Sequence, residues 1–146
     1  TDGLSVWGVA FHNQEFRSAY AGIVKKIGNW SVALGAGSAW YDDVRHTVIN
    51  PWAYYAADGL EAFLTAEHYS REEASPWYYK GYLTKKFSGS FFAGIYGEKD
   101  VGIGPMIGWQ WSEKVRFSLA VPVTHRPNRD SEVGRTKAIV SVAIEF

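Results

Sequence analysis

The stretch Glu67-His68-Tyr69-Ser70 brings together side chains that could carry out acyl transfer. His68 and Ser70 are two residues apart, so on an extended strand they share one face and lie within reach of each other. A histidine can deprotonate a serine for attack on an acyl carbonyl when a carboxylate orients its imidazole. Glu72 or Glu73, just beyond, could supply that carboxylate. These residue types indicate a candidate catalytic nucleophile (Ser70), a base (His68) and an orienting acid.

The same stretch resembles the His-x-Ser motif of the PagL family of outer-membrane lipid A deacylases, over four residues. The resemblance implies a Ser-His-Glu site on the outer wall of a membrane β-barrel that acts on acyl chains of lipid A. The chain departs from that family because several strands follow the motif rather than one, and because Arg71 takes the place of an Asn. The alternative is that His68 and Ser70 are rim residues in the headgroup zone, where polar amphipathic side chains are at home.

A second group of candidate binding residues is basic. The segment 125–135 carries Arg126, Arg129 and Arg135. Their guanidinium groups could hold phosphates of lipopolysaccharide through bidentate hydrogen bonds. The alternative is an exposed loop whose arginines are neutralised by its own acidic residues.

His12 is the last candidate binding residue. With the stretch Val9-Ala10-Phe11-His12 before Gly28-Asn29-Trp30, the chain resembles the PagP family of outer-membrane lipid A palmitoyltransferases. Only the barrel context carries over, because Tyr41-Asp42-Asp43 stands where that family has its Asp-Ser pair. No two metal ligands converge in the sequence, so we expect neither a metal nor another cofactor.

The composition excludes several other classes of protein. The charges cancel, with 15 Lys+Arg against 15 Asp+Glu, so no long-range field would attract nucleic acid. Cysteine is absent, which excludes disulfide scaffolds, thiol catalysis and cysteine-based zinc sites. A length of 146 residues suits a single domain, and we expect one over 1–146.

The elements that must position these side chains are strands, because apolar residues recur with a period of two. In the clearest case, Val140, Val142 and Ile144 alternate with Ser141 and Ala143. Turn-like interruptions divide the chain into about ten strands. The predicted strands lie near 4–12, 16–26, 29–41, 46–57, 59–70, 76–86, 88–98, 101–111, 114–124 and 136–146.

The consecutive hairpins predict an all-β fold, a single up-and-down antiparallel barrel. The weakest of the strands is 46–57, because Pro51 would break a central ladder. Eight strands are therefore an alternative to ten.

Three features favour a transmembrane barrel over a soluble one. Opposite the apolar face lie small residues, as in the stretch 31–39, and scattered charges that could pair inside a narrow lumen. Trp30 and Trp40, ten residues apart on one apolar face, are roughly 25 Å apart along the axis of a tilted barrel, the height of a lipid-facing band between aromatic girdles. Third, Val140-x-Val142-x-Ile144-x-Phe146 resembles the C-terminal assembly signal of Gram-negative outer-membrane β-barrel proteins.

The resemblances imply a bacterial outer membrane, membrane lipid or lipopolysaccharide and the barrel-insertion machinery as partners, and a monomer. With an even strand count, the loops at 12–15, 41–45, 71–75, 97–100 and 125–135 face outward and the shorter turns face the periplasm. Three functions stay open: an acyl-ester hydrolase or acyltransferase acting on lipid A, a non-catalytic surface barrel that binds a partner or lipopolysaccharide or is structural, and a soluble barrel that holds a hydrophobic ligand.

Overall fold

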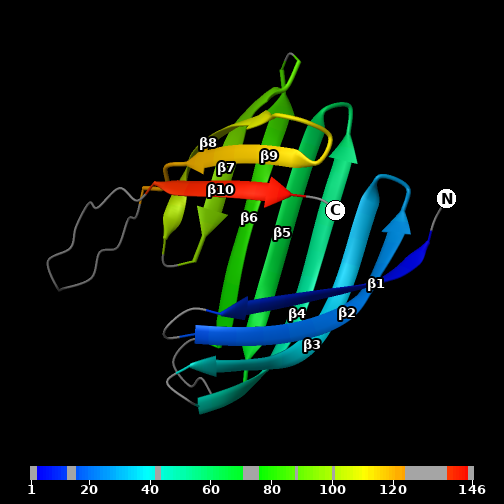
Figure 1. Cartoon of the computed structure of the whole chain (residues 1–146), viewed down its shortest axis with the longest axis vertical. Coiled ribbons are helices and arrows are strands. Elements are labelled where there is room, and N and C mark those ends of the chain that lie inside the picture. The colour runs from blue at the N-terminus through cyan, green and yellow to red at the C-terminus, as the bar shows by residue number, and fades with distance from the viewer. Residues whose placement is uncertain are drawn as a thin grey trace, which may run out of the picture. The chain divides into compact units, whose positions relative to one another are not determined.

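The chain folds as one antiparallel sheet of ten strands, ordered β1 to β10 as in the sequence (Figure 1). The computed structural model describes residues 3–12, 16–41, 44–70, 76–87, 89–99, 101–123 and 138–144. The predicted all-β, up-and-down fold with ten strands is confirmed, and the eight-strand alternative is wrong. The strands are β1 (Leu4–His12), β2 (Phe16–Ile27), β3 (Trp30–Tyr41), β4 (Val44–Ala57), β5 (Leu60–Tyr69), β6 (Trp77–Lys86), β7 (Phe91–Glu98), β8 (Gly102–Gln110), β9 (Val115–Ala120) and β10 (Ile139–Ile144).

The turn between β4 and β5 shows how the sequence sets the hairpins. It consists of Asp58 and Gly59, whose φ angles are 50° and 73°. Two consecutive positive φ values are typical of a type I′ turn, which matches the twist of the flanking strands and favours Asp-Gly. Lys85 Nζ donates to the carbonyl oxygen of Asp58 at 2.6 Å. The turn therefore brings two strands together with a two-residue loop.

Strand β4 runs through Pro51, contrary to the expectation that this proline would break the ladder. Proline has no N–H to donate to a neighbouring strand. The side chain of Asn50 supplies a donor instead: its Nδ2 lies 2.9 Å from the Ala66 carbonyl oxygen and 2.9 Å from Thr65 Oγ1. Asn50 is only 3% exposed, so this amide is a buried link between the two strands. A side-chain donor beside the proline keeps the strand in the sheet.

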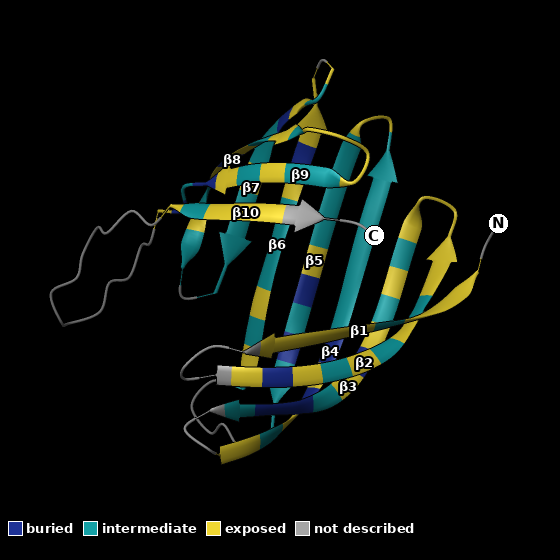
Figure 2. Cartoon of the chain, in the orientation of Figure 1, coloured by how far each residue is buried: buried dark blue, intermediate teal, exposed yellow. Residues whose placement is uncertain are grey.

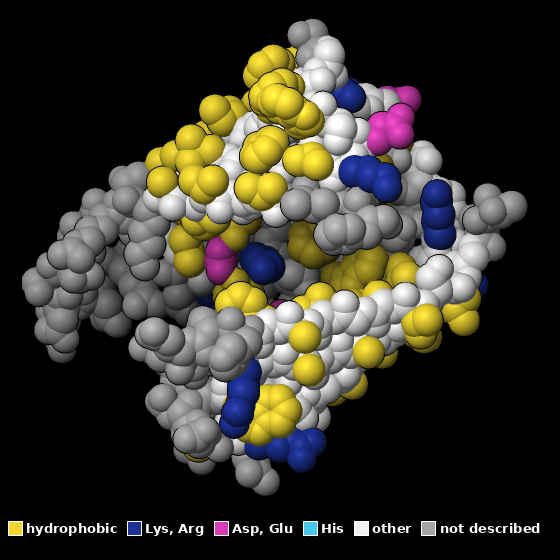
Figure 3. Space-filling view, viewed as in Figure 1, with side chains coloured by type: hydrophobic (Ala, Val, Ile, Leu, Met, Phe, Trp, Pro, Cys, Tyr) yellow, Lys and Arg dark blue, Asp and Glu magenta, His cyan; other side chains and the backbone are white. Residues whose placement is uncertain are grey.

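Exposed and buried positions alternate along most strands, as the bands of colour along β2 in Figure 2 show. We call the exposed side the apolar face, because large hydrophobic side chains occupy it. In one part of the sheet it carries Leu4, Val6, Ile23, Ile27, Trp30, Val32, Leu34, Ile49, Leu64, Trp77 and Tyr79. In another part it carries Leu83, Phe91, Ile95, Ile103, Ile107, Trp109, Phe117, Leu119, Val140 and Val142. Figure 3 shows such side chains over β8 and β9.

By its internal contacts the chain divides into two units. Unit 1 comprises residues 1–55 and 63–79, and unit 2 comprises 56–62 and 80–146. Strands β4, β5 and β6 contribute to both.

On the buried side of unit 1, aromatic rings pack over small residues. The Trp7 indole meets the rings of Tyr20 and Trp52 edge to face, each at 5.9 Å between centroids. Gly35 lies beneath this indole: a Cβ at Gly35 would lie 2.6 Å from Trp7 Cζ2. Small residues on this side are therefore required by crowding, as the sequence predicts.

The buried side of unit 2 has its own core, formed by Phe92, Met106 and Ala120. Here the crowded position is Gly108, where a Cβ would lie 2.0 Å from Phe92 Cζ. Both units therefore combine bulky rings with glycine on the side opposite the apolar face.

Candidate functional site

The predicted catalytic residues His68 and Ser70 lie at the end of β5, in unit 1. The Ser70 Oγ accepts a hydrogen bond from the Thr47 N–H at 2.8 Å, and the Ser70 N–H donates to the Thr47 carbonyl oxygen at 2.9 Å. The His68 ring packs edge-on against Trp77, with 4.8 Å between centroids. Among the residues that the structure describes, no hydrogen bond joins His68 to Ser70. Each side chain is held by a different neighbouring strand, Ser70 by β4 and His68 by β6.

A second histidine, His46 on β4, contacts Ser70, and the sequence alone does not predict this contact. Its Nδ1 is 2.6 Å from the Ser70 carbonyl oxygen. A carbonyl oxygen only accepts, so Nδ1 carries the proton of this contact and Nε2 keeps a lone pair in the neutral ring. The contact could have been found only from the register of β4 against β5, because 24 residues separate the two.

The other predicted site residues are described in part or not at all. Glu72 and Glu73, proposed to orient the histidine, lie outside the described residues, as do Arg126, Arg129 and Arg135. For His12 the structure describes the main chain, which ends β1 in register with Arg17 of β2. Their roles stay predictions from the sequence.

Near this strand end, the buried side of unit 1 holds a carboxylate that the sequence did not single out as a site. Glu67 is 8% exposed, and its oxygens accept hydrogen bonds from the hydroxyls of Tyr20, at 2.9 Å, and Tyr69. Both donors are phenolic, which suits a buried carboxylate because each supplies one O–H without a charge. This cluster is a hydrogen-bonded part of the interior.

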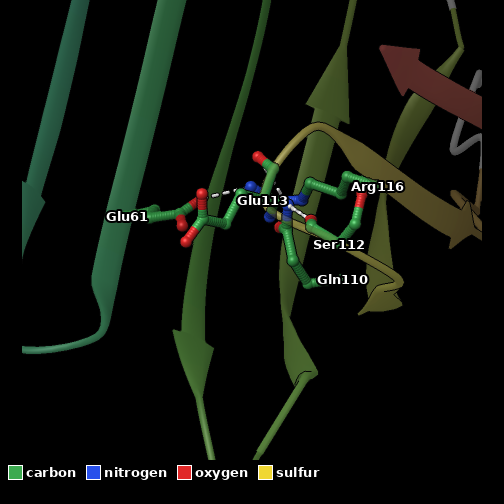
Figure 4. Close-up of polar contacts among 5 residues, drawn as sticks. All are labelled: Glu61, Gln110, Ser112, Glu113 and Arg116. Carbon is green, nitrogen blue, oxygen red and sulfur yellow. Dashed lines mark hydrogen bonds and ion pairs between the residues drawn. The ribbon is translucent and has the colours of Figure 1, made fainter. Parts of the chain in front are cut away.

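In unit 2 two partly buried charges form an ion pair, as predicted for the inward-facing charges. Arg116 Nη1 pairs with Glu61 Oε2 (Figure 4). The guanidinium lies over the Phe92 ring, 3.8 Å from its centroid, and 5.7 Å from the centroid of Tyr82. Stacking and ion pairing together hold this charged group against the aromatic side chains of unit 2.

Aromatic side chains gather where strands of the apolar face end. In unit 1, the rings of Trp30 and Tyr55 lie 4.8 Å apart. In unit 2, Phe91 stacks on Trp109 at 6.0 Å, and Trp109 meets Trp111 at 4.9 Å. Tryptophan and tyrosine with an apolar body and a polar N–H or O–H are enriched where a membrane meets water.

A comparison of this chain with protein-family models, with curated proteins and with solved structures finds no significant match. Within the described segments, no helix has the length and apolarity needed to cross a membrane.

Proposed function

We propose that this chain is an integral β-barrel protein of a bacterial outer membrane, with its ten strands closed so that the apolar face contacts lipid chains. One observation carries the proposal: large hydrophobic side chains are exposed along both units, from Leu34 at 55% in β3 to Ile107 at 57% in β8. Soluble monomers rarely expose continuous apolar surface of this extent. In a bilayer the same apolar side chains would contact lipid chains and not water.

The opposite side of the sheet argues against a soluble barrel that holds a hydrophobic ligand. Such a barrel would turn its apolar face inward and its polar face to water. Here the most buried positions include Asn50, Thr65, Glu67 and Thr84, at 2% to 8% exposure. Polar residues at the buried positions and hydrophobic residues at the exposed ones are the arrangement of a transmembrane barrel.

Folding into lipid tests this proposal. The chain, unfolded in urea, is diluted into phosphatidylcholine vesicles or into lipid-free buffer. We expect β-sheet circular dichroism, heat-modifiable gel migration and protection from trypsin only with vesicles or detergent. A monomer that folds fully in lipid-free buffer would contradict a lipid-facing surface.

A second proposal for function is acyl chemistry on lipid A at the loop end of β5. The observation that favours it is that Ser70 lies at the end of a strand whose apolar face continues through Leu64, 61% exposed. An acyl ester of a neighbouring lipid could then approach Ser70 Oγ. In the reaction, Oγ attacks the ester carbonyl, His68 takes the hydroxyl proton and returns it to the leaving sugar oxygen, and water then hydrolyses the acyl-enzyme.

Mass spectrometry of lipid A tests the catalytic proposal. Protein folded in vesicles that contain lipid A is expected to remove or transfer one acyl chain. The variants Ser70→Ala and His68→Ala are expected to abolish the mass change, whereas Ser5→Ala, an exposed serine on β1, keeps it. Unchanged lipid A with folded wild-type protein would leave the non-catalytic surface barrel as the function.

A further inference from the structure

Three adjacent strands of unit 1 place two arginines on either side of one tryptophan. In the register of the sheet, Arg17 of β2 is paired with Trp40 of β3, and Trp40 is paired with Arg45 of β4. Directly paired residues of antiparallel strands project to the same side. The three side chains therefore form a row across the sheet, on the same side as Leu34 and Trp30 of β3.

The indole holds both guanidinium groups. Arg17 Cζ lies 5.5 Å and Arg45 Cζ 5.9 Å from the centroid of the Trp40 ring. Both distances fall within the range of cation–π attraction, which tryptophan supports best among the aromatic residues. Trp40 thus contacts both cations.

Arg45 has a second anchor. Its Nε donates to Ser38 Oγ at 3.0 Å, and Ser38 is 9% exposed. A guanidinium has five N–H donors in a fixed plane, so the bond through Nε orients the four donors of the two terminal amino groups. Both arginines are themselves exposed.

We propose that Arg17, Trp40 and Arg45 form a binding site for the phosphate of a lipid headgroup. Two guanidinium groups supply the charge and the paired donors that a phosphate accepts. The position fits a lipid rather than a free anion, because the row ends an apolar face and a lipid bound there can lay its chains along Leu34. This inference rests on the proposed membrane function and adds to it the chemical group that the loop end of unit 1 recognises.

Binding of lipid A tests the site. Wild-type protein is folded into phosphatidylcholine nanodiscs, and fluorescent lipid A that carries both phosphates is titrated in. Arms with lipid A stripped of its phosphates, and with excess inorganic phosphate as competitor, distinguish a lipid phosphate from a free anion. We expect tight binding of phosphorylated lipid A, weak binding of the stripped lipid, and little competition by inorganic phosphate.

The variants make the test specific for the row. Arg17→Gln/Arg45→Gln is expected to weaken binding by about 10- to 100-fold, because charge-assisted hydrogen bonds are lost. Arg17→Lys/Arg45→Lys keeps the charge but loses the planar guanidinium. Its affinity for lipid A should lie between those of the wild type and Arg17→Gln/Arg45→Gln. Lys25→Gln/Lys26→Gln removes the same charge at the other end of β2 and should change binding by less than about threefold.

Heat-modifiable migration and circular dichroism establish that each variant is folded. If the wild type inserts into nanodiscs and Arg17→Gln/Arg45→Gln binds lipid A as tightly, the phosphate site is wrong while the membrane proposal stands. The same conclusion follows if the variant loses stability and the folded fraction still binds lipid A as tightly as the wild type. A wild type that does not insert overturns the membrane proposal itself.

Discussion

The two ends of β3 carry the same residue type on the same face and surround it differently. Trp30, 50% exposed, begins the strand and lies 4.8 Å from the ring of Tyr55. Trp40, near the other end, lies between the guanidinium groups of Arg17 and Arg45. One indole has a neutral aromatic partner and the other has two cations. The two ends of the strand therefore differ in the charge of the groups around their tryptophans.

Other strand ends repeat this difference. At the loop end of β5, within unit 1, the ring that packs on Trp77 is the imidazole of His68. Within unit 2, where β7 begins and β8 ends, Trp109 contacts both Phe91 and Trp111. Basic groups accompany tryptophan near the end of β3 and at the end of β5, and aromatic groups accompany it at the start of β3 and the end of β8. Such a difference suits a membrane whose two surfaces differ in phosphate and charge.

The largest loss of stability is expected when a charged residue replaces an apolar one in the middle of β3. Leu34→Arg places a guanidinium on the apolar face between the two tryptophans. It should destabilise the protein folded in vesicles by about 2–4 kcal/mol. Ile27→Arg, in register with Trp30 at the strand's end, should cost about 0–1 kcal/mol because the interface solvates the charge. Urea titration of both variants in phosphatidylcholine vesicles gives the two values.

The control for this pair is Ile27→Met and Leu34→Met, which change shape without charge. Equal costs for the two arginine variants would show that depth along β3 does not matter. The proposal that the ends of β3 lie at the membrane interfaces would then be wrong.

The strands themselves were predictable from the sequence because the pleat leaves a period of two in the residue types. Strand β5 was predicted at 59–70 and spans Leu60–Tyr69. Strand β9, predicted at 114–124, ends as a regular strand at Ala120, since Pro122 interrupts it. The N–H groups of Val121 and Val123 nevertheless still bond to the carbonyl oxygens of Pro105 and Ile103. The expectation that Pro51 would break β4 was wrong. The Asn50 side chain donates to β5 beside the proline, and such a contact between strands cannot be read from the sequence.

For the candidate site, the sequence predicted only the relations between residues of one strand. The alternation placed His68 and Ser70 together, but their partners, Trp77 and Thr47, come from neighbouring strands. The row of Arg17, Trp40 and Arg45 was missed for the same reason. Register is set by loop lengths and turn geometry, and a shift of one residue would move every side chain to the other face. A sequence pattern reports which face a residue occupies, and not which residue stands beside it.

A smaller effect should distinguish the two tryptophan environments by their response to salt. In a double-mutant cycle, Trp40→Leu combined with Arg17→Gln/Arg45→Gln should give a coupling of about 1–2 kcal/mol, from two cation–π contacts. The cycle of Trp30→Leu with Tyr55→Leu should give about 0.5–1.5 kcal/mol, from one aromatic pair.

Repeating both cycles at about 1 M salt, where the Debye length is about 3 Å, should reduce the first coupling and leave the second unchanged. The reason is that only the first involves charges, at 5.5 Å and 5.9 Å from the ring. Unfolding in urea, followed by tryptophan fluorescence, gives each corner of the cycles. An identical salt response at both ends would remove the distinction between them.

The smallest effect is expected from Ser38→Ala, which removes the acceptor of Arg45 Nε. The free energy of unfolding should fall by at most about 1 kcal/mol, because the exposed guanidinium can bond to water or headgroups instead. The affinity for phosphorylated lipid A should fall by about threefold, because Arg45 is no longer held in one plane and more of its freedom is lost on binding. Ser31→Ala, on the same strand but the other face, serves as the matched control. If both variants bind phosphorylated lipid A as the wild type does, the orientation of Arg45 by Ser38 contributes nothing, and the polarity of β3 resides in charge alone.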